Sequence, residues 1–321
     1  MKLPQLKIKD LMPQYPIIQG GMAVRVATWP LAGAVANSGG IGLIGASGMQ
    51  GDEVTDEILK AKKLSPNGII GINIMFVARN FFEVVEAATK AGTDLIVSGA
   101  GFSRDVFKYG QEHGVAIVSV VSTAKTALLA LKCGADAVIV EGKEAGGHLG
   151  TDRPMMEILK ETIEAISKKI PVIGAGGVID GKGIADAIKL GADGVQMGTR
   201  FVMSEECTVS PKFKELYLNT PKENVKLFHS PVGLPGRAIR TKFLDSVLNN
   251  TVEPFKCSYL CMKSCKRNFC IIQSLMNARQ GDIDDAIVFC GENYWKIKDI
   301  LPVQTIIDNL VREANENLQD V

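Results

Sequence analysis

Residues 171–199 read PVIGAGGVIDGKGIADAIKLGADGVQMGT, and they contain two apolar runs separated by a stretch with helical spacing. The runs are Pro171–Gly176 and Gly194–Thr199, and the helical stretch is Gly183–Leu190. Apolar runs without alternating polar residues are typical of strands in a parallel sheet that helices cover. The stretch therefore predicts a strand–helix–strand unit of an α/β fold.

The same unit recurs throughout the first two-thirds of the chain. The other candidate strands are Pro16–Gln19, Ile41–Gly45, Ile69–Phe76, Leu95–Ala100, Val115–Val121 and Ala137–Gly142, and the helical stretches include Asp52–Lys63, Phe82–Ala91, Thr123–Cys133 and Met155–Lys169. Eight strands at a period of about 25 residues match a (β/α)8 TIM barrel. A doubly wound open sheet produces the same local pattern with fewer strands, so it stays the alternative.

The repeat stops after Phe201, which suggests a change of domain. We interpret residues 1–206 as the barrel and 207–294 as a smaller, mainly helical cap docked over the barrel mouth. Residues 295–321 contain one more helical pattern, Val303–Asn317, and we expect this C-terminal helix to pack back on the barrel.

Composition excludes several classes of protein. The 321 residues are 46% hydrophobic, which is enough for a sizeable core. The 36 basic and 35 acidic side chains leave a net charge of +1, so nucleic acid is not an expected partner. No apolar run is long enough to cross a membrane, and the N-terminus does not resemble a secretory signal. Seven cysteines, an odd number, fit free thiols in a reducing compartment, so we expect a cytoplasmic protein.

Glycines gather where the candidate strands end. The pairs and triplets are Gly20-Gly21, Gly45 with Gly48, Gly99 with Gly101, Gly146-Gly147, Gly174 with Gly176-Gly177, and Gly198. Chemistry in a TIM barrel takes place at the carboxyl ends of the strands, and a phosphate site often follows strands seven and eight. Glycine lets the backbone approach such a ligand closely. The pattern favours a phosphate-bearing cofactor, either a nucleotide or a flavin mononucleotide, although βα loops are rich in glycine for structural reasons too.

His148 is the candidate for catalysis because it directly follows the sixth strand. An imidazole can donate or accept a proton near neutral pH. The alternative is a loop histidine with a purely structural role. His113 precedes the fifth strand and His229 falls in the cap, so we expect both to be structural or solvated.

Five motifs carry a resemblance to a known family. They are Pro16–Met22, Gly71–Asn73, Ala135–His148, Pro171–Gly177 and Gly194–Phe201. Together they resemble the nitronate monooxygenase (2-nitropropane dioxygenase) family, which includes the flavin-dependent enoyl-acyl-carrier-protein reductase II and NAD(P)H:quinone reductases. The resemblance spans residues 1 to about 205 and implies FMN at the mouth of a TIM barrel, with a smaller domain over its ring.

The resemblance also implies which residues contact the cofactor. They are Gly21, Met22, Asn73, Glu141, Gly146, Gly176, Gly177, Gln196, Met197, Gly198 and Thr199. Thr199 and the backbone of Gly176–Gly177 would hold the phosphate. His148 matches a histidine that acts as a base or orients the substrate. Many nitronate monooxygenases have glutamine at the position of Glu141, whereas the enoyl reductases have glutamate, and this departure leans toward the reductases.

The implied activity is that of an FMN-dependent oxidoreductase that oxidises alkyl nitronates with O2. One alternative is an NAD(P)H-dependent enoyl-acyl-carrier-protein reductase II or quinone reductase, and another is a flavin- and thiol-based redox-sensing module. The expected partners are a small-molecule substrate, either a nitronate or an enoyl thioester, and NAD(P)H as an electron donor. A homodimer is compatible with this interpretation.

Two cap motifs lie outside the resemblance. Cys257, Cys261, Cys265 and Cys270 crowd together, and on a helix the first three would share one face. Reduced thiols are our preferred interpretation, with a zinc or iron–sulfur site and a redox disulfide as alternatives, and we assign no metal ligand. The second motif is the segment Ser230–Arg237 together with Arg240. Its two arginines could bind a phosphate, or the segment could simply end a helix and expose their charges.

Overall fold

The computed structural model describes residues 1–99 and 101–319. Eight parallel strands close into a barrel in the order β1-β2-β3-β4-β5-β6-β8-β9, which confirms the predicted (β/α)8 fold. The strands are β1 (Ile17–Gln19), β2 (Ile41–Gly45), β3 (Ile69–Met75), β4 (Leu95–Gly99), β5 (Ala116–Val121), β6 (Ala137–Glu141), β8 (Val172–Ala175) and β9 (Gly194–Met197). They match the eight predicted strands closely, and Ala100, at the end of the fourth predicted strand, lies outside the described residues.

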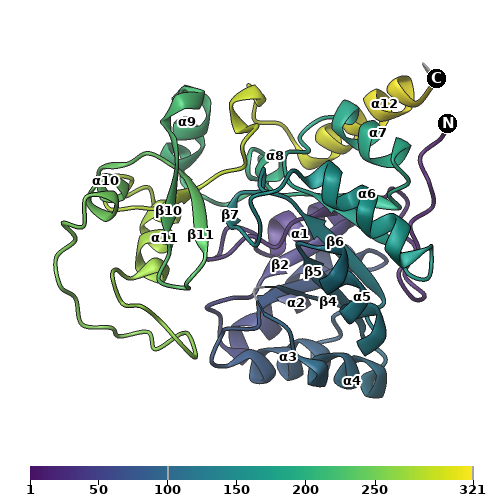
Figure 1. Cartoon of the computed structure of the whole chain (residues 1–321), viewed down its shortest axis with the longest axis horizontal. Helices are drawn as coiled ribbons and strands as arrows, with labels where there is room; N and C mark the ends of the chain where they lie inside the picture. Colours follow the sequence, from purple (N-terminus) through teal and green to yellow (C-terminus); the bar gives the residue numbers. More distant parts are fainter. Residues whose placement is uncertain (100, 320–321) are drawn as a thin grey trace.

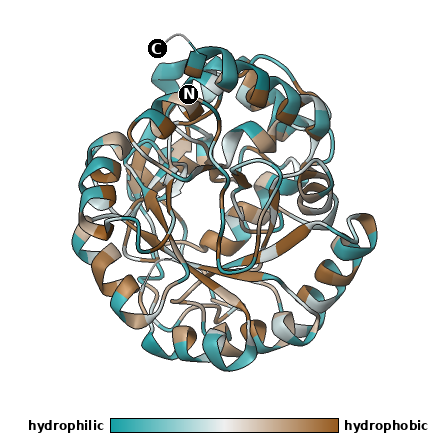
Figure 2. Cartoon of the chain, turned by 90° about the vertical axis from the view of Figure 1, so that its right-hand side faces the viewer, coloured by the Kyte–Doolittle hydropathy of each residue, from teal (hydrophilic) through white to brown (hydrophobic). Residues whose placement is uncertain are grey.

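Helices surround the barrel and cover its outer face (Figure 2). They are α1 (Trp29–Asn37), α2 (Gly51–Leu64), α3 (Phe81–Lys90), α4 (Arg104–His113), α5 (Ala124–Cys133), α6 (Met155–Ile166), α7 (Gly181–Lys189) and the short α8 (Thr199–Val202). In Figure 2 the helices turn hydrophobic residues toward the strands and hydrophilic residues outward. The helices bury the outer face of the sheet and side chains inside the barrel bury its inner face, which is why the strands read as continuous apolar runs.

Two hydrophobic layers hold the barrel together. The outer layer lies between the strands and the surrounding helices, and the inner layer lies inside the barrel. The inner layer contains Leu43, Val97 and Ile139, which are fully buried inside the barrel. Leu6 and Ile8, which precede the first strand, join this inner layer and are also fully buried. The N-terminal segment therefore contributes side chains to the interior of the barrel before the first strand begins.

The C-terminal helix α12 (Val303–Gln319) packs against α7 of the barrel. Glycine at position 181 permits the close approach, because a Cβ there would lie 2.3 Å from the Cβ of Glu313. The Gly181 N–H donates to the Glu313 carboxylate at 3.0 Å, so the helix start is also held by a hydrogen bond. Figure 1 shows the start of the chain and the helix α12 on the barrel side of the molecule.

The cap lies over one end of the barrel (Figure 1) and contains a sheet that the sequence pattern did not predict. Its elements are α9 (Pro211–Asn219), η1 (Lys222–Asn224), β10 (Val225–His229), β11 (Pro235–Ile239), α10 (Lys242–Leu248), α11 (Ile271–Gln280), β12 (Val288–Phe289) and η2 (Tyr294–Lys296). The strand β11 pairs with β10, β12 and β7 (Gly147–His148). The expectation of a mainly helical cap thus missed a hairpin, because its short strands around Pro231 and Pro235 resemble broken helix.

The cysteine-rich segment is not helical, so the helix on which Cys257, Cys261 and Cys265 would share one face does not form. Residues 251–270 run without a helix from α10 to α11. The segment is pinned to the barrel instead: Arg79 N–H donates to the Cys261 carbonyl and Lys263 N–H to the Val77 carbonyl, both at 3.0 Å. Tertiary contacts with the β3–α3 loop replaced the local hydrogen bonds that a helix would need.

Candidate active site

A cavity of about 300 Å³ lies at the carboxyl ends of the barrel strands, between the barrel and the cap. On the barrel side it is lined by the ends of β1, β3, β6, β8 and β9 and by the loops that follow them. On the cap side it is lined by α11 and by residues around β12. Its position is the one where TIM barrels carry out chemistry, so it is the candidate active site.

Three residues after β8 and β9 line this cavity and have backbone N–H groups without a partner among the described residues. Within the described chain, the N–H groups of Gly177, Gly198 and Thr199 donate no hydrogen bond to a backbone acceptor. Gly177 has a φ of +75°, which favours glycine and turns the chain sharply there. Unpaired N–H groups at such a turn form a cradle for an anion such as a phosphate.

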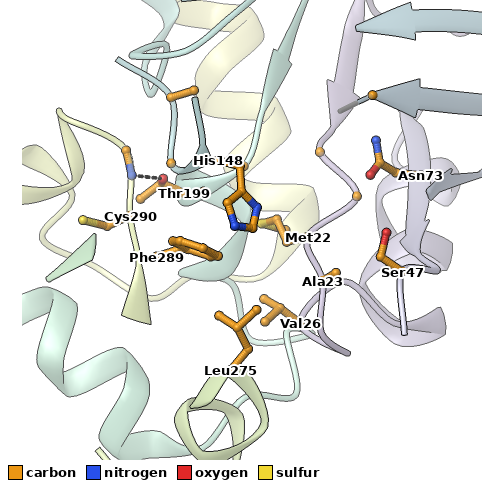
Figure 3. Close-up of a pocket in the computed structure, with 18 of the residues that line it drawn as sticks. Met22, Ala23, Val26, Ser47, Asn73, His148, Thr199, Leu275, Phe289 and Cys290 are labelled. Carbon is orange, nitrogen blue, oxygen red and sulfur yellow. Dashed lines mark hydrogen bonds between the residues drawn. The ribbon is translucent and has the colours of Figure 1, made fainter. Parts of the chain in front are cut away.

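The cap completes this cradle. The Gly291 N–H donates to Thr199 Oγ1 at 3.0 Å, drawn as the dashed line in Figure 3. The Asn293 side chain donates to the Gly177 carbonyl at 2.7 Å. The segment from Cys290 to Asn293 therefore fixes the loops after β8 and β9 relative to each other.

Two neighbouring positions show how the wall beside the cradle is shaped. Gly21 lies directly against Asn73, and a Cβ at position 21 would come within 2.2 Å of the Asn73 Cβ. Gln196 projects from β9 into the cavity, and its buried Oε1 has no hydrogen-bond partner within the described chain. A buried amide oxygen without a partner is costly, which indicates that a ligand donor belongs beside Gln196.

Glu141 and His148 are two of the titratable side chains that line the cavity, together with Glu144, Tyr217, Cys261 and Cys290. Burial raises the pKa of Glu141 to about 7. Burial lowers the pKa of His148 to about 4, because a cation is poorly solvated there. At neutral pH the imidazole is therefore neutral, while the Glu141 carboxyl is close to its titration midpoint.

His148 is held by the cap as well as by the barrel. Its strand β7 pairs with β11 of the cap, with Gly236 opposite His148. Its ring contacts Phe289 edge to face, with the centroids 5.1 Å apart. Its Nε2 lies 2.7 Å from the hydroxyl of Ser230. Figure 3 shows the imidazole pointing between Phe289 and Met22 into the cavity.

Away from the cradle the cavity is apolar. The side chains there come from the β1–α1 loop, the cysteine-rich segment, α11 and the strand β12, and they are Val24, Val26, Met262, Ile271, Ile272, Leu275, Ile287 and Phe289. None of the described residues that line the cavity is a lysine or an arginine. This part suits an uncharged, apolar group rather than an anion.

The structure brings almost all of the predicted site residues together. His148, Gly21, Met22, Asn73, Glu141, Gly146, Gly176, Gly177, Gln196, Gly198 and Thr199 all line the cavity. Met197 does not, because successive strand residues point to opposite faces, and its side chain is buried in the outer layer. Its carbonyl still accepts the Gly20 N–H at 2.9 Å.

Residues that sequence reasoning missed come mainly from the cap. Ser230, Phe289, Gly291 and Asn293 had no local signal, because each depends on how the cap docks. Ser47 also lines the cavity and accepts the Met75 N–H at 2.9 Å, and its position after the second strand could have identified it.

The arginines of the cap fasten loops and do not line the cavity. Arg237 donates to the Lys143 carbonyl at 2.7 Å and lies 3.7 Å from Glu292, and Arg240 pairs with Asp245 at 2.7 Å. The structure thus favours the structural interpretation of this segment over a phosphate grip.

The seven cysteines are free thiols. Burial raises the pKa of Cys261 and Cys270, and nearby thiols of the segment add to this effect. Within residues 1–99 and 101–319, no group of three or more His, Cys, Asp or Glu side chains is placed to hold a metal ion. In the same residues, no helix is long and apolar enough to cross a membrane.

A closed barrel with a lined cavity at the carboxyl ends of its strands defines a TIM-barrel enzyme. The chain belongs to the nitronate monooxygenase family, whose model, described as "Nitronate monooxygenase", matches residues 5–93 and 70–313. This family consists of oxidoreductases that are generally flavin-dependent. The expected family and enzyme class are thereby confirmed.

Curated relatives fall into two groups. The chain is 32% identical over 235 residues to the (3aS,4S,5R,7aS)-5-hydroxy-7a-methyl-1-oxo-octahydro-1H-indene-4-carboxyl-CoA dehydrogenase of Mycobacterium tuberculosis, covering 73% of this chain but only 65% of that relative. It is 25% identical to a probable nitronate monooxygenase of Staphylococcus aureus, covering 95% of this chain and 96% of the relative.

Solved structures agree with the fold. FabK from Thermotoga maritima, an enoyl-acyl-carrier-protein reductase II, is 31% identical and superposes with a TM-score of 0.85 over 96% of this chain and 95% of FabK. A nitroalkane oxidase from Streptomyces ansochromogenes is similar in fold, with a TM-score of 0.80 at 22% identity, covering 99% and 98% of the two chains.

Proposed function

We propose that this protein is an FMN-dependent oxidoreductase that reduces the carbon–carbon double bond of an enoyl thioester with electrons from NADH or NADPH. The observation that carries the proposal is the apolar part of the cavity, which has no cationic side chain among its described lining residues. An enoyl thioester is uncharged at its reacting end, whereas a nitronate is an anion. The identity to FabK and to a CoA-thioester dehydrogenase supports the same substrate class.

The residues of the cavity fit FMN. The unpaired N–H groups of Gly177, Gly198 and Thr199 would hold its phosphate, and the unpartnered Gln196 Oε1 would accept a hydrogen bond from its ring. Gly21 and Gly146 would let the backbone approach the ring. FMN, when bound, supplies the two-electron chemistry that amino-acid side chains lack.

The side chains around the cofactor site orient the substrate and exclude water. The neutral imidazole of His148 would donate a hydrogen bond to the thioester oxygen. The carboxyl of Glu141 has a pKa of about 7, so it would hold a proton in part of the molecules at neutral pH. Ile272 and Leu275 of α11 would cover the acyl chain.

Oxidation of alkyl nitronates is the second candidate. It is supported by the probable nitronate monooxygenase of Staphylococcus aureus, which aligns over 95% of this chain. A nitronate is small enough for the cavity, and the neutral imidazole of His148 could donate a hydrogen bond to one of its oxygens. The redox-sensing alternative would require a thiol response in place of turnover.

Stopped-flow reduction of the yellow protein under anaerobic conditions tests these candidates. NADH, NADPH and propyl nitronate are mixed with the protein in parallel, and the reduced protein is then mixed with crotonyl-CoA. We expect NADH or NADPH to reduce the flavin and bleach its yellow colour, and we expect crotonyl-CoA to reoxidise the flavin and restore the colour. Bleaching by propyl nitronate alone would support the second candidate and overturn the first.

His148→Ala is the companion experiment. We expect the variant to keep its yellow flavin, because His148 is not part of the phosphate cradle, and to lose most of its turnover with the true substrate. Unchanged turnover in this variant would remove His148 from the reaction.

A further inference from the structure

The cap places a buried hydroxyl against the histidine of the active site. Ser230 Oγ lies 2.7 Å from His148 Nε2, although the two residues are 82 positions apart in the chain. Ser230 has no exposed surface, and it begins the turn between β10 and β11. A fully buried hydroxyl normally satisfies a specific partner, and here that partner is the imidazole.

Backbone hydrogen bonds hold both members of this pair in place. The Ser230 N–H donates to the Leu234 carbonyl at 3.0 Å, and the Gly233 N–H donates to the Ser230 carbonyl at 2.9 Å. On the barrel side, the Leu149 N–H donates to the Pro235 carbonyl at 2.8 Å. Since β7 also pairs with β11, the backbones that carry the two side chains are fixed relative to each other.

The surroundings of Ser230 determine the direction of its hydrogen bond. The Val232 N–H points at Ser230 Oγ from 3.4 Å and donates to it. Ser230 Oγ makes no other side-chain hydrogen bond to a described residue, so His148 Nε2 is the acceptor that satisfies the buried hydroxyl proton. Burial lowers the pKa of His148 to about 4, so the ring carries a single N–H at neutral pH.

That single N–H is consequently on Nδ1. Nδ1 makes no hydrogen bond to any described residue, and His148 lines the cavity. A ring with its proton on Nδ1 and its Nε2 occupied by Ser230 can only donate toward a ligand.

We propose that Ser230 is a positioning residue that holds His148 in the Nδ1–H tautomer, so that the imidazole acts as a hydrogen-bond donor to the substrate rather than as a base. The kind of acceptor, a thioester oxygen, rests on the proposed function. The tautomer itself follows from contacts within the chain and does not depend on which substrate is bound.

Nitrogen-15 NMR of the histidine side chains tests the tautomer directly at pH 7 in the flavin-loaded protein. We expect the wild type to show His148, assigned by its loss in His148→Ala, with its proton on Nδ1. We expect Ser230→Ala to show a mixture of the two tautomers, and Ser230→Thr, which keeps the hydroxyl, to restore the Nδ1–H form. An Nε2–H form in the wild type, or no change in Ser230→Ala, would overturn the proposal.

A matched control separates positioning from folding. Ser274 is also a buried serine of the cap, and among the described residues its hydroxyl bonds only to the Ile271 carbonyl, at 3.1 Å. Ser274→Ala should leave the His148 signal unchanged. Bound flavin, measured by absorbance, should be the same in Ser230→Ala and in wild type, since Ser230 does not line the cavity.

Turnover provides a second readout. Ser230→Ala should lower kcat roughly three- to tenfold, the effect of one hydrogen bond, and Ser230→Thr should recover most of it. In a His148→Ala background, Ser230→Ala should cost nothing more, because the two residues act as one unit. Equal and additive losses in both backgrounds would contradict a positioning role.

The outcomes separate this inference from the proposed function. An Nδ1–H signal together with no reduction of crotonyl-CoA would leave the tautomer in place and remove the thioester substrate. Reduction of crotonyl-CoA together with an Nε2–H signal would support the thioester substrate and overturn the proposed tautomer.

Discussion

At the level of single residues, the cavity depends on glycines whose backbone conformation no other residue adopts readily. Gly177 combines a φ of +75° with close packing, because a Cβ there would lie 3.0 Å from the Glu144 Cβ and 3.3 Å from Asn293 Nδ2. Its own N–H belongs to the cradle. A side chain at this position would strain the loop and displace the N–H groups at once.

Gly177→Ala should therefore lower both stability and flavin affinity. We expect the free energy of unfolding to fall by about 1–2 kcal/mol and the dissociation constant for FMN to rise about tenfold or more. Gly114→Ala is the control, because Gly114 has nearly the same φ, +73°, and a Cβ at this position would meet no atom within 4 Å. Flavin titration of both variants checks this, and equal affinities would contradict the role of Gly177.

Glu141 predicts a specific dependence of stability on pH. Its pKa is raised from 4.5 to about 7 by burial, so the folded protein binds its proton more tightly than the unfolded chain does. This contribution is fully present below pH 4.5 and is lost as the pH rises through 7. Its total size is at most about 3.5 kcal/mol, at roughly 1.4 kcal/mol per pKa unit.

Denaturant unfolding of the flavin-free protein, wild type against Glu141→Gln, measures this effect between pH 4 and pH 8. The wild type should lose stability relative to the variant as the pH rises. His148 acts in the opposite direction, since its lowered pKa removes stability as the pH falls toward 4, but it is present in both proteins and cancels. A difference that does not change with pH would show that Glu141 is not buried as described.

At the level of elements, the packing of α12 on α7 ties the end of the chain to the barrel. A Cβ at Gly181 would lie 2.3 Å from the Glu313 Cβ and 2.4 Å from the Ala314 nitrogen, and one of these contacts is with backbone that cannot rotate away. The two helices would have to separate to accept even one methyl group.

Gly181→Ala should destabilise the protein by about 1–3 kcal/mol, the usual cost of overpacking. Gly183→Ala lies on the same helix, and its Cβ would come no closer than 3.3 Å, so it should change stability much less. Thermal unfolding compares the two variants. A Gly181→Ala variant as stable as Gly183→Ala would mean that α12 does not pack closely on α7.

The elements also show where sequence patterns fail. The barrel strands are local apolar runs that end in glycine, and such runs are predictable. The strands β10 and β11 and the segment 251–270 are held by contacts with β7 and with the β3–α3 loop, which lie far away in the chain. The hydrophobic periodicity of the cap sequence does not predict those contacts.

At the level of the whole molecule, barrel, cap and C-terminal helix share one hydrophobic core. Ile17 of β1, Tyr217 of α9 and Leu310 of α12 belong to the same buried cluster. The cap also has a cluster of its own, which includes Phe228, Leu244 and Phe269. The shared cluster nevertheless joins the three parts assigned from the sequence, so we expect them to unfold together.

The two tryptophans allow this to be measured. Trp29 begins α1 of the barrel and Trp295 lies in η2 of the cap. We expect Trp29→Phe and Trp295→Phe, each with one remaining tryptophan, to give coincident denaturant transitions within error. Two separated transitions would show that the cap unfolds independently of the barrel.

The sequence by itself determined the eight-stranded barrel, the family and most of the wall of the cavity, because glycines and polar residues after each strand converge wherever parallel strands close. Strand alternation alone could have excluded Met197, whose neighbour Gln196 occupies the inner face. Only the tertiary structure decided how the cap completes the site. Ser230 contacts His148, and Gly291 contacts Thr199, because the sheet of β10, β11 and β12 also pairs with β7 of the barrel. Contacts between segments that lie far apart in the chain stabilise this docking, and a local sequence pattern does not show them.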